Sequence, residues 1–144
     1  EKLHLTIKKL ELKIVKTEIY YKEAHTLGVP IKGVENLKEQ LFGLEANFEE
    51  LRAIDFKKGC YIGQENTARM KLKKKLRRKL MSIKCNSILK IGDEIKYNSF
   101  VIGKILIGEP FPFGLIKLFD PDYSVFKDKK LKINNLDVEL INNL

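Results

Sequence analysis

Residues 57–65 read Lys-Lys-Gly-Cys-Tyr-Ile-Gly-Gln-Glu, and the rest of the chain is organised around them. Glycine adopts backbone conformations with positive φ at little steric cost, so Gly59 and Gly63 mark two turns. Between these turns the chain carries Cys60 and two apolar neighbours. The pattern predicts a tight loop that presents a thiol, and it does not fit an element of the core.

A helix is predicted directly after this loop, because residues 64–72 are for the most part good helix formers. Cys60 would then lie near a helix N-terminus. The partial positive charge there, together with Lys57 and Lys58, favours the thiolate of Cys60 over the thiol. Such a thiolate acts as a nucleophile, a redox group or a metal ligand. The alternative is a small apolar cysteine buried beside Tyr61, since free cysteine is often buried.

The run from Lys58 to Glu65 resembles the signature of the YgfZ family of folate-binding proteins. These proteins are relatives of the aminomethyltransferase, or T protein, of the glycine cleavage system. The flanks agree with the family over roughly residues 20 to 80. The matching flanks are Leu27-Gly28-Val29-Pro30, Leu44-Glu45-Ala46-Asn47, Leu51, Asp55-Phe56 and Thr67-Ala68-Arg69.

The resemblance implies a folate-dependent accessory factor that supports assembly or repair of iron-sulfur clusters, including those of enzymes that modify tRNA. Its implied cofactor is tetrahydrofolate, with transient contact to an iron-sulfur cluster, and its implied partners are iron-sulfur client or assembly proteins. Its implied location is the bacterial cytoplasm or, in a eukaryote, an organelle. Cys60 is the implied reacting thiolate. The residues implied to bind or position the cofactor are Lys58, Gly59, Tyr61, Gly63, Gln64 and Glu65.

The alternative is an aminomethyltransferase that handles one-carbon units on tetrahydrofolate. In that transferase a glutamate contacts the pterin ring two places before the glycine of a Gly-hydrophobic-Pro turn. The corresponding position here is Thr26, with Glu23 one helical turn away. The transferase also needs no thiol and uses an aspartate that this chain does not supply. These departures argue against aminomethyl transfer and leave folate binding open.

A basic run over residues 69–79 predicts a strong positive field next to the cysteine loop. Its cations are Arg69, Lys71, Lys73, Lys74, Lys75, Arg77, Arg78 and Lys79. Clustered cations attract RNA phosphates or the glutamyl tail of folate. The alternative is a solvated helix end and linker, and no aromatic residue interleaves to stack on bases. An RNA-binding module would show affinity that falls steeply with salt and little effect of Cys60→Ala.

The composition of the chain limits the classes of protein to which it can belong. The 144 residues are 44% hydrophobic, enough for one or two small domains, and the formal net charge is +9. The alternative is that this charge reflects only the abundance of lysine in a chain that is also rich in isoleucine and asparagine, and has no role in function. No apolar run approaches a membrane span, and neither the two cysteines nor the two histidines show metal-ligand spacing. We expect a piece of a longer polypeptide, because the first residue is Glu1.

Several elements are predicted before the cysteine loop. Alternating apolar residues over 3–16 predict a strand, two strands, or a strand running into a helix. A helix is expected over residues 17–27, capped by Thr17 and stopped by Gly28. A loop with one helical turn follows, and then a helix over residues 44–53. Its acidic residues Glu45, Glu49 and Glu50 are expected on a solvated face, with a site role for Glu45 as the alternative.

From residue 79 onward, short apolar runs alternate with Gly, Asn, Asp and Pro turns. Six short strands at this spacing predict a small antiparallel barrel or sandwich, and the family resemblance also implies a C-terminal β-barrel. Cys85 is expected on a strand as ordinary packing, and the loop at 110–113 is expected to cover the barrel end. The fold class is therefore α+β, with the end of a folate-binding domain over residues 1–76 and a barrel over residues 77–144.

Overall fold

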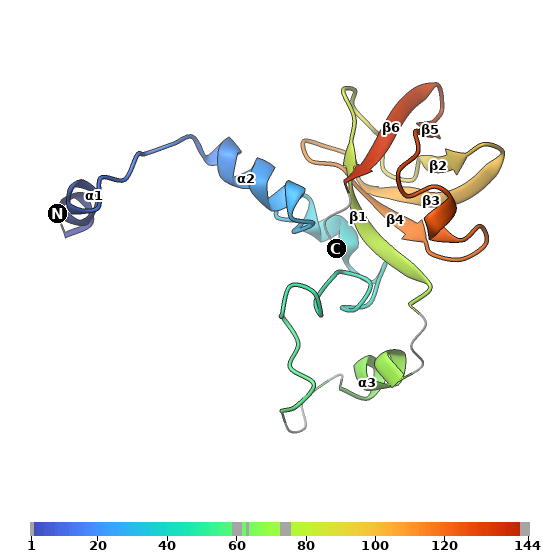
Figure 1. Ribbon diagram of the computed structural model, residues 1–144, viewed down its shortest axis with the longest axis horizontal. Helices are drawn as coiled ribbons and strands as arrows, with labels where there is room; N and C mark the ends of the chain where they lie inside the picture. The colour runs from blue at the N-terminus through green and yellow to red at the C-terminus, as the bar shows by residue number, and fades with distance from the viewer. Residues whose placement is uncertain (1, 59–61, 63, 73–75, 142–144) are drawn as a thin grey trace.

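The computed structural model describes residues 2–58, 62, 64–72 and 76–141 (Figure 1). The helices are α1 (Lys2–Lys9), α2 (Thr17–Thr26), the 3-10 helix η1 (Val34–Leu37), α3 (Gln64–Leu72) and the 3-10 helix η2 (Tyr123–Val125). The strands are β1 (Arg78–Lys84), β2 (Glu94–Tyr97), β3 (Phe100–Ile107), β4 (Phe113–Lys117), β5 (Leu131–Ile133) and β6 (Leu136–Ile141). The predicted α+β class is confirmed. No described helix has the length and apolar character needed to cross a bilayer.

The strands form a closed antiparallel barrel in the order β1-β4-β3-β2-β5-β6, which confirms the predicted barrel. Two hairpins close through two-residue turns in which Asn98 and Asn134 have positive φ, 53° in each case. Asparagine tolerates this conformation, and such turns match the twist of the flanking strands. The division into residues 1–76 and 77–144 stays a prediction of domain organisation.

The barrel strands carry two apolar clusters, and Leu37 and Leu41 from the segment before the barrel pack against the smaller one. The larger includes Ile83, Ile95 and Ile105, and the smaller includes Leu80 and Phe113. All five side chains are at most 1% exposed. Burial of apolar surface is the main favourable term in folding, so the barrel has its own source of stability.

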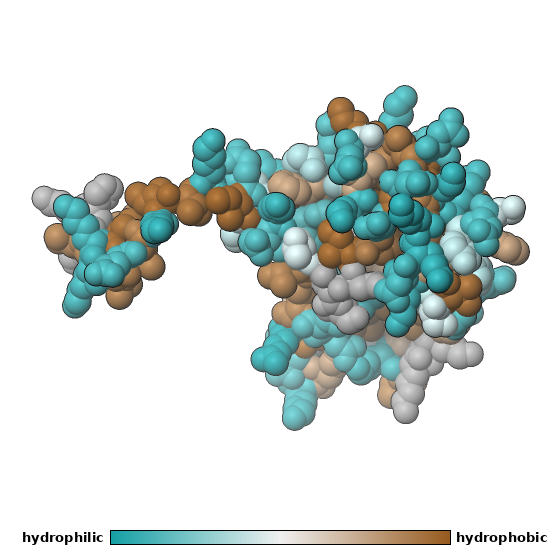
Figure 2. Space-filling model, turned by 45° about the horizontal axis from the view of Figure 1, so that its top comes forward, coloured by the Kyte–Doolittle hydropathy of each residue, from teal (hydrophilic) through white to brown (hydrophobic). Residues whose placement is uncertain are grey.

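The strand predicted over residues 3–16 is wrong. Residues 2–9 form the helix α1, and the chain from 12 to 16 has no regular structure. A strand needs a neighbour for its N–H and C=O groups, whereas a helix satisfies them internally. Figure 1 shows that this N-terminal arm stands away from the rest of the molecule, and Figure 2 shows apolar residues along it. Leu3 and Leu5, for example, are 70% and 67% exposed.

Helix α2 confirms the helix predicted at this place. It ends at Gly28, which has a φ of 72°. The Gly28 N–H donates to the His25 carbonyl at 3.0 Å, and the Val29 N–H donates to the Ala24 carbonyl at 2.8 Å. These two bonds make a Schellman motif, which glycine favours at this position. The predicted cap is wrong, because Lys16 occupies the N-cap position and makes no side-chain cap bond.

The helix predicted over residues 44–53 is also wrong, because residues 43–52 form a series of turns. Asn47 and Arg52 have φ values of 65° and 55°, which interrupt a right-handed helix. The Phe48 N–H reaches back five residues to Gly43 at 3.1 Å, one residue further than an α-helix allows. The single helical turn expected in the preceding loop corresponds to η1, and α3 begins at the predicted residue, Gln64.

Candidate functional site

Four of the predicted site residues, Gly59, Cys60, Tyr61 and Gly63, lie outside the described residues. The described residues among and around them lie at the surface. Lys58, Ile62 and Glu65 are exposed, and Gln64 is half-buried as the first residue of α3. Glu65 pairs with Arg69 one helical turn later, at 2.7 Å.

The chain enters the cysteine loop through a short turn. The Asp55 carboxylate accepts a hydrogen bond from the Lys57 N–H at 2.8 Å. This arrangement is an Asx turn, in which an aspartate side chain replaces a backbone acceptor. Asp55 therefore braces the turn that leads into the cysteine loop.

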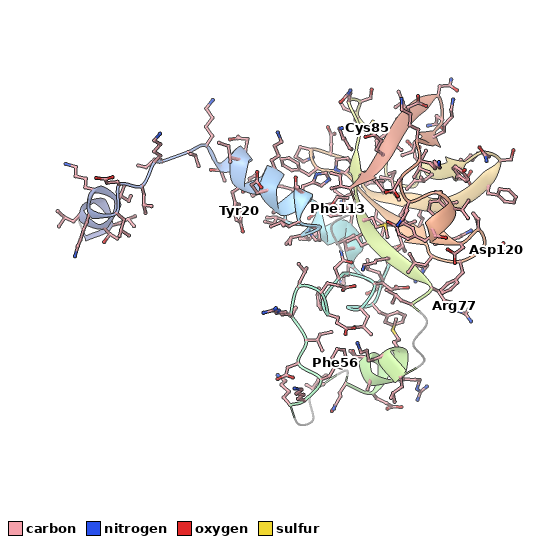
Figure 3. The ribbon with its side chains drawn as sticks, in the orientation of Figure 1. Tyr20, Phe56, Arg77, Cys85, Phe113 and Asp120 are labelled. Carbon is pink, nitrogen blue, oxygen red and sulfur yellow. The ribbon has the colours of Figure 1, made fainter. Side chains whose placement is uncertain are left out.

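The two arms of the loop, residues 53–58 before it and α3 after it, are fastened to each other. The Lys71 ammonium of α3 lies over the Phe56 ring at 5.2 Å from its centre, and Figure 3 shows Phe56 beside α3. Lys71 also forms an ion pair with Glu49. Because Glu49 and Phe56 both precede the loop and Lys71 follows it, these contacts bring the two arms together.

Residues 42–52, which we name the anchoring segment, join this loop to the barrel. Glu45 is only 4% exposed, and its carboxylate accepts bonds from Arg78 Nε and a terminal guanidinium nitrogen at 2.9 and 3.1 Å. It also accepts from the Phe42 N–H at 3.0 Å. The backbone carbonyl of Glu45 accepts from the Leu80 N–H at 2.7 Å. Glu45 therefore fastens the anchoring segment to β1.

The solvated acidic face predicted for this segment is wrong for Glu45, which is buried, and each of its three acids is ion-paired. Glu49 pairs with Lys71, and Glu50 pairs with Lys79 at 2.5 Å. The sequence pattern placed these acids on a helix that does not form. The turns instead direct them towards cations that come later in the chain.

Asn47 is a residue that the sequence analysis did not single out beyond the family-like flank. It is 1% exposed, and its amide nitrogen donates to the carbonyls of Leu80 at 3.0 Å and Gly28 at 3.4 Å. Its amide oxygen has no hydrogen-bond partner among the described residues. Its place in the family-like run Leu44-Glu45-Ala46-Asn47 was the only signal in the sequence that pointed to this residue.

The basic run is less positive than its composition suggests. Four of its described cations, Arg69, Lys71, Arg78 and Lys79, are paired with carboxylates. Arg77 is exposed at the start of β1. Ion pairing lowers the field available to an anionic partner. RNA contact through residues 69–79 stays a prediction.

Helix α2 contacts the barrel through His25, which is 8% exposed. His25 Nε2 donates to the Pro112 carbonyl at 2.8 Å, which assigns the proton to that nitrogen because a carbonyl only accepts. Phe113 meets the imidazole edge-on with ring centres 5.0 Å apart, and Phe111 lies 5.6 Å away. Burial lowers the pKa of His25, and the bond to Pro112 opposes this. The 110–113 loop therefore binds α2, whereas its expected cover of the barrel end stays a prediction.

The second cysteine, Cys85, packs against the barrel core. Cys85 directly follows β1 instead of lying on it, and it packs against the larger apolar cluster as expected. It also lines a surface pocket of about 230 Å³ with Lys84, Lys130 and Glu139. Figure 3 places Cys85 and Arg77 at opposite ends of β1, and Arg77 is the residue on the α3 side. No group of three or more metal-ligating side chains occurs among the described residues.

Comparison with known proteins gives three informative relatives, while no family model matches the chain. "Iron-sulfur cluster assembly factor IBA57 homolog, mitochondrial" of Phaeosphaeria nodorum is 35% identical over 74 residues, which are 51% of this chain and 18% of that protein. The protein of the same name from Neurospora crassa is 36% identical over 62 residues, covering 43% and 14%. "tRNA-modifying protein YgfZ" of Buchnera aphidicola is 40% identical over 63 residues, covering 42% and 20%.

The matched stretch thus spans a fifth or less of the length of each of these relatives. The similarity is modest but recurs across fungal and bacterial proteins. Together with the barrel, it confirms the resemblance seen in the sequence, and this chain is a homologue of the IBA57 and YgfZ proteins.

Proposed function

We propose that this chain carries the reactive cysteine loop of an iron-sulfur cluster assembly factor. The names of its IBA57 relatives support cluster assembly as the process. The observation that carries the proposal is the fastening of the loop: Asp55 braces its entry, and Lys71 joins its exit to Glu49 and Phe56. The described residues before and after the loop are thus joined to each other, and Ile62 and Glu65 are exposed.

Cys60 is the residue proposed to react. Cysteine thiolates are the usual protein ligands of iron-sulfur clusters, and a cluster in transit is here the cargo. The start of α3 and the nearby Lys57 and Lys58 provide positive charge that favours the thiolate. The Lys57 side chain is exposed, so its charge can also attract an incoming protein.

Tetrahydrofolate is the cofactor proposed for the protein. The described residues fit its anionic glutamyl tail, because Lys57 and Lys58 supply exposed cations beside the loop. At the position of the pterin-contacting acid, Thr26 is exposed at the end of α2 and offers only a hydroxyl. Bound tetrahydrofolate would supply a one-carbon carrier, while the residues of this chain hold its charged end.

Client enzymes and location follow from the relatives. The name of the YgfZ relative supports a role in tRNA modification, which we assign to iron-sulfur enzymes that receive clusters. The mitochondrial IBA57 relatives support an organelle as the location in a eukaryote, and the YgfZ relative supports the cytoplasm in a bacterium.

The first test is the reactivity of the thiol. The rate of Cys60 alkylation by iodoacetamide is measured against pH in a Cys85→Ser background, with and without tetrahydrofolate. We expect an apparent pKa below the free-cysteine value of about 8.5, and a change on adding tetrahydrofolate. A midpoint at or above that value in both conditions contradicts the proposed thiolate.

The second test is made in cells that lack the protein. They are supplied with the complete protein carrying Cys60→Ala or, as the matched control, Cys85→Ala. We expect the activity of an iron-sulfur enzyme to be restored by the Cys85 variant alone. Equal restoration by both variants would show that the Cys60 thiol is not needed.

A further inference from the structure

Asn47 lies where three parts of the molecule meet. Its amide nitrogen donates to the Leu80 carbonyl in β1 and to the Gly28 carbonyl that follows α2. Both acceptors are backbone oxygens, so the nitrogen must face them and the amide orientation is fixed. A side chain that is 1% exposed therefore joins the anchoring segment to both the barrel and α2.

The backbone conformation at position 47 also favours asparagine. Its φ of 65° lies in the left-handed region, which asparagine tolerates better than other residues with a side chain. The same conformation breaks the helix that the sequence favours over residues 44–53. Because the helix is broken here, the segment can direct Glu45 and Asn47 to β1 and Glu49 to α3.

The anchoring segment covers an open edge of β1. Strand β6 pairs with β1 at residues 82–84, whereas β4 pairs with it from residue 78 to residue 82. On the side that β6 leaves open, the Leu80 N–H donates to Glu45 and the Leu80 carbonyl accepts from Asn47. Unpaired strand edges are exposed to unwanted pairing, and a covering segment prevents it.

Both arms of the cysteine loop are joined to the anchoring segment. The arm before the loop continues directly from this segment, which is bonded to Leu80. The arm after the loop, α3, is joined to it by the ion pair between Lys71 and Glu49. The spacing between the two arms is therefore set by how the anchoring segment lies on β1.

We propose that Asn47 is a positioning residue for the Cys60 loop, acting by fixing the anchoring segment on β1 and α2. This inference rests on the proposed role of Cys60, and it assigns Asn47 no contact with the cluster or with folate. It predicts that the reactivity of Cys60 depends on a buried side chain thirteen positions earlier in the sequence.

The test uses the full chain with Cys85→Ser and compares Asn47→Gly, Asn47→Ala and Arg52→Gly. Glycine keeps the left-handed backbone and removes the hydrogen bonds, so it folds even where alanine at φ 65° does not. Arg52→Gly is the matched control, because Arg52 has a φ of 55° in the same segment and an exposed side chain. Iodoacetamide alkylation of Cys60 is followed from neutral to alkaline pH, and urea unfolding of the barrel is measured in parallel.

We expect both Asn47 variants to shift the midpoint of the Cys60 profile by about one pH unit towards the free-cysteine value, or to change the limiting rate at high pH several-fold. The Arg52 variant should match the parent in both readouts. An unchanged profile in Asn47→Gly, even with lower stability, overturns the proposal, because Asn47 would then be structural only. An equal change in Arg52→Gly overturns it as well.

The two proposals fail separately. If the parent profile has its midpoint at the free-cysteine value, the thiolate role of Cys60 is wrong, but the limiting rate still reports how the loop is positioned. If the parent profile is shifted and Asn47→Gly leaves both readouts unchanged, the role of Cys60 stands and the positioning role of Asn47 is wrong.

Discussion

The barrel and the region before it are held in place by different forces. In the barrel, side chains such as Ile95, Ile105 and Phe126 are fully buried in a continuous apolar core. Before the barrel, the described residues include few buried apolar side chains, among them Ala24 and Leu44. Polar contacts with the barrel, together with the packing of Leu37 and Leu41 on the smaller apolar cluster, locate this region. The barrel is therefore stabilised by its own core. The segments that flank the cysteine loop depend instead on contacts with residues that are distant in the sequence.

Two of the polar connections to the barrel are made by buried side chains. His25 of α2 bonds to Pro112, and the anchoring segment bonds to β1 through Glu45 and Asn47. Each joins residues at least 33 positions apart in the sequence. Loss of one connection should therefore loosen the site without unfolding the barrel, and this separation can be tested.

The largest effect is expected from Phe126→Ala. The Phe126 side chain is fully buried and meets Tyr123 edge-on with ring centres 5.5 Å apart. Truncating it should lower the free energy of unfolding by about 3–5 kcal/mol, measured by urea denaturation with circular dichroism. Leu12→Ala, in the arm at 56% exposure, is the control and should change stability by less than about 0.5 kcal/mol. Similar losses in both variants would refute the contrast between the two regions.

A smaller effect is expected from Glu45→Ala. It leaves the Phe42 N–H and Arg78 without their acceptor, and should lower the free energy of unfolding by about 1–3 kcal/mol. This range is below that of a fully buried pair because the Arg78 side chain is 41% exposed. Hydrogen exchange should rise over residues 42–52 and stay unchanged in β3. Faster exchange throughout the barrel would show that the two regions are not separate. Glu49→Ala removes an exposed pair and serves as the matched control.

A pH dependence is expected at the contact between α2 and the barrel. Burial lowers the pKa of His25, so the unfolded chain binds its proton more readily than the folded one. The contact is therefore at full strength above the unfolded pKa of about 6.5 and weakens as pH falls below it. Thermal unfolding at pH 7.5 and 5.5, in a His4→Gln background, should show lower stability at pH 5.5. His25→Gln should lose this difference, and an unchanged difference would assign it to other groups.

The smallest effect is expected from Lys71→Met. The ion pair between Lys71 and Glu49 is exposed on both sides, so its loss should change stability by no more than about 1 kcal/mol. A double-mutant cycle with Glu49→Gln, followed by urea denaturation, measures the coupling of the pair directly. A coupling of several kcal/mol would mean that the two arms of the loop are joined as firmly as the barrel core.

Local patterns in the sequence predicted a large part of this fold. Alternating apolar residues and turn residues such as Asn98 and Asn134 indicated the barrel strands, and Gly28 marked the end of α2. The run over residues 57–65 indicated a resemblance to the YgfZ family, and partial matches to proteins named IBA57 and YgfZ agree with it. These predictions succeeded because strands, caps and turns are encoded by residues that are neighbours in the chain.

The candidate site was predicted less completely. The cysteine loop stays a prediction, because most of it lies outside the described residues. Asn47, Glu45 and His25 were not assigned the contacts that hold the anchoring segment and α2 on the barrel. Periodicity alone placed the acids of residues 44–53 on a solvated helix, and the arm before Thr17 in a strand. In both places the deciding factor was a contact, present or absent, with a distant part of the chain.

The sequence by itself determined the barrel, the two principal helices and the relationship to IBA57 and YgfZ proteins. Only the tertiary structure decided that the first residues are helical, that residues 43–52 turn at Asn47, and that the acidic side chains meet the cations of α3 and β1. The physical reason is the range of the interactions. A pattern of neighbouring residues records local conformation, whereas a buried polar group is stable only where the rest of the fold supplies its partner.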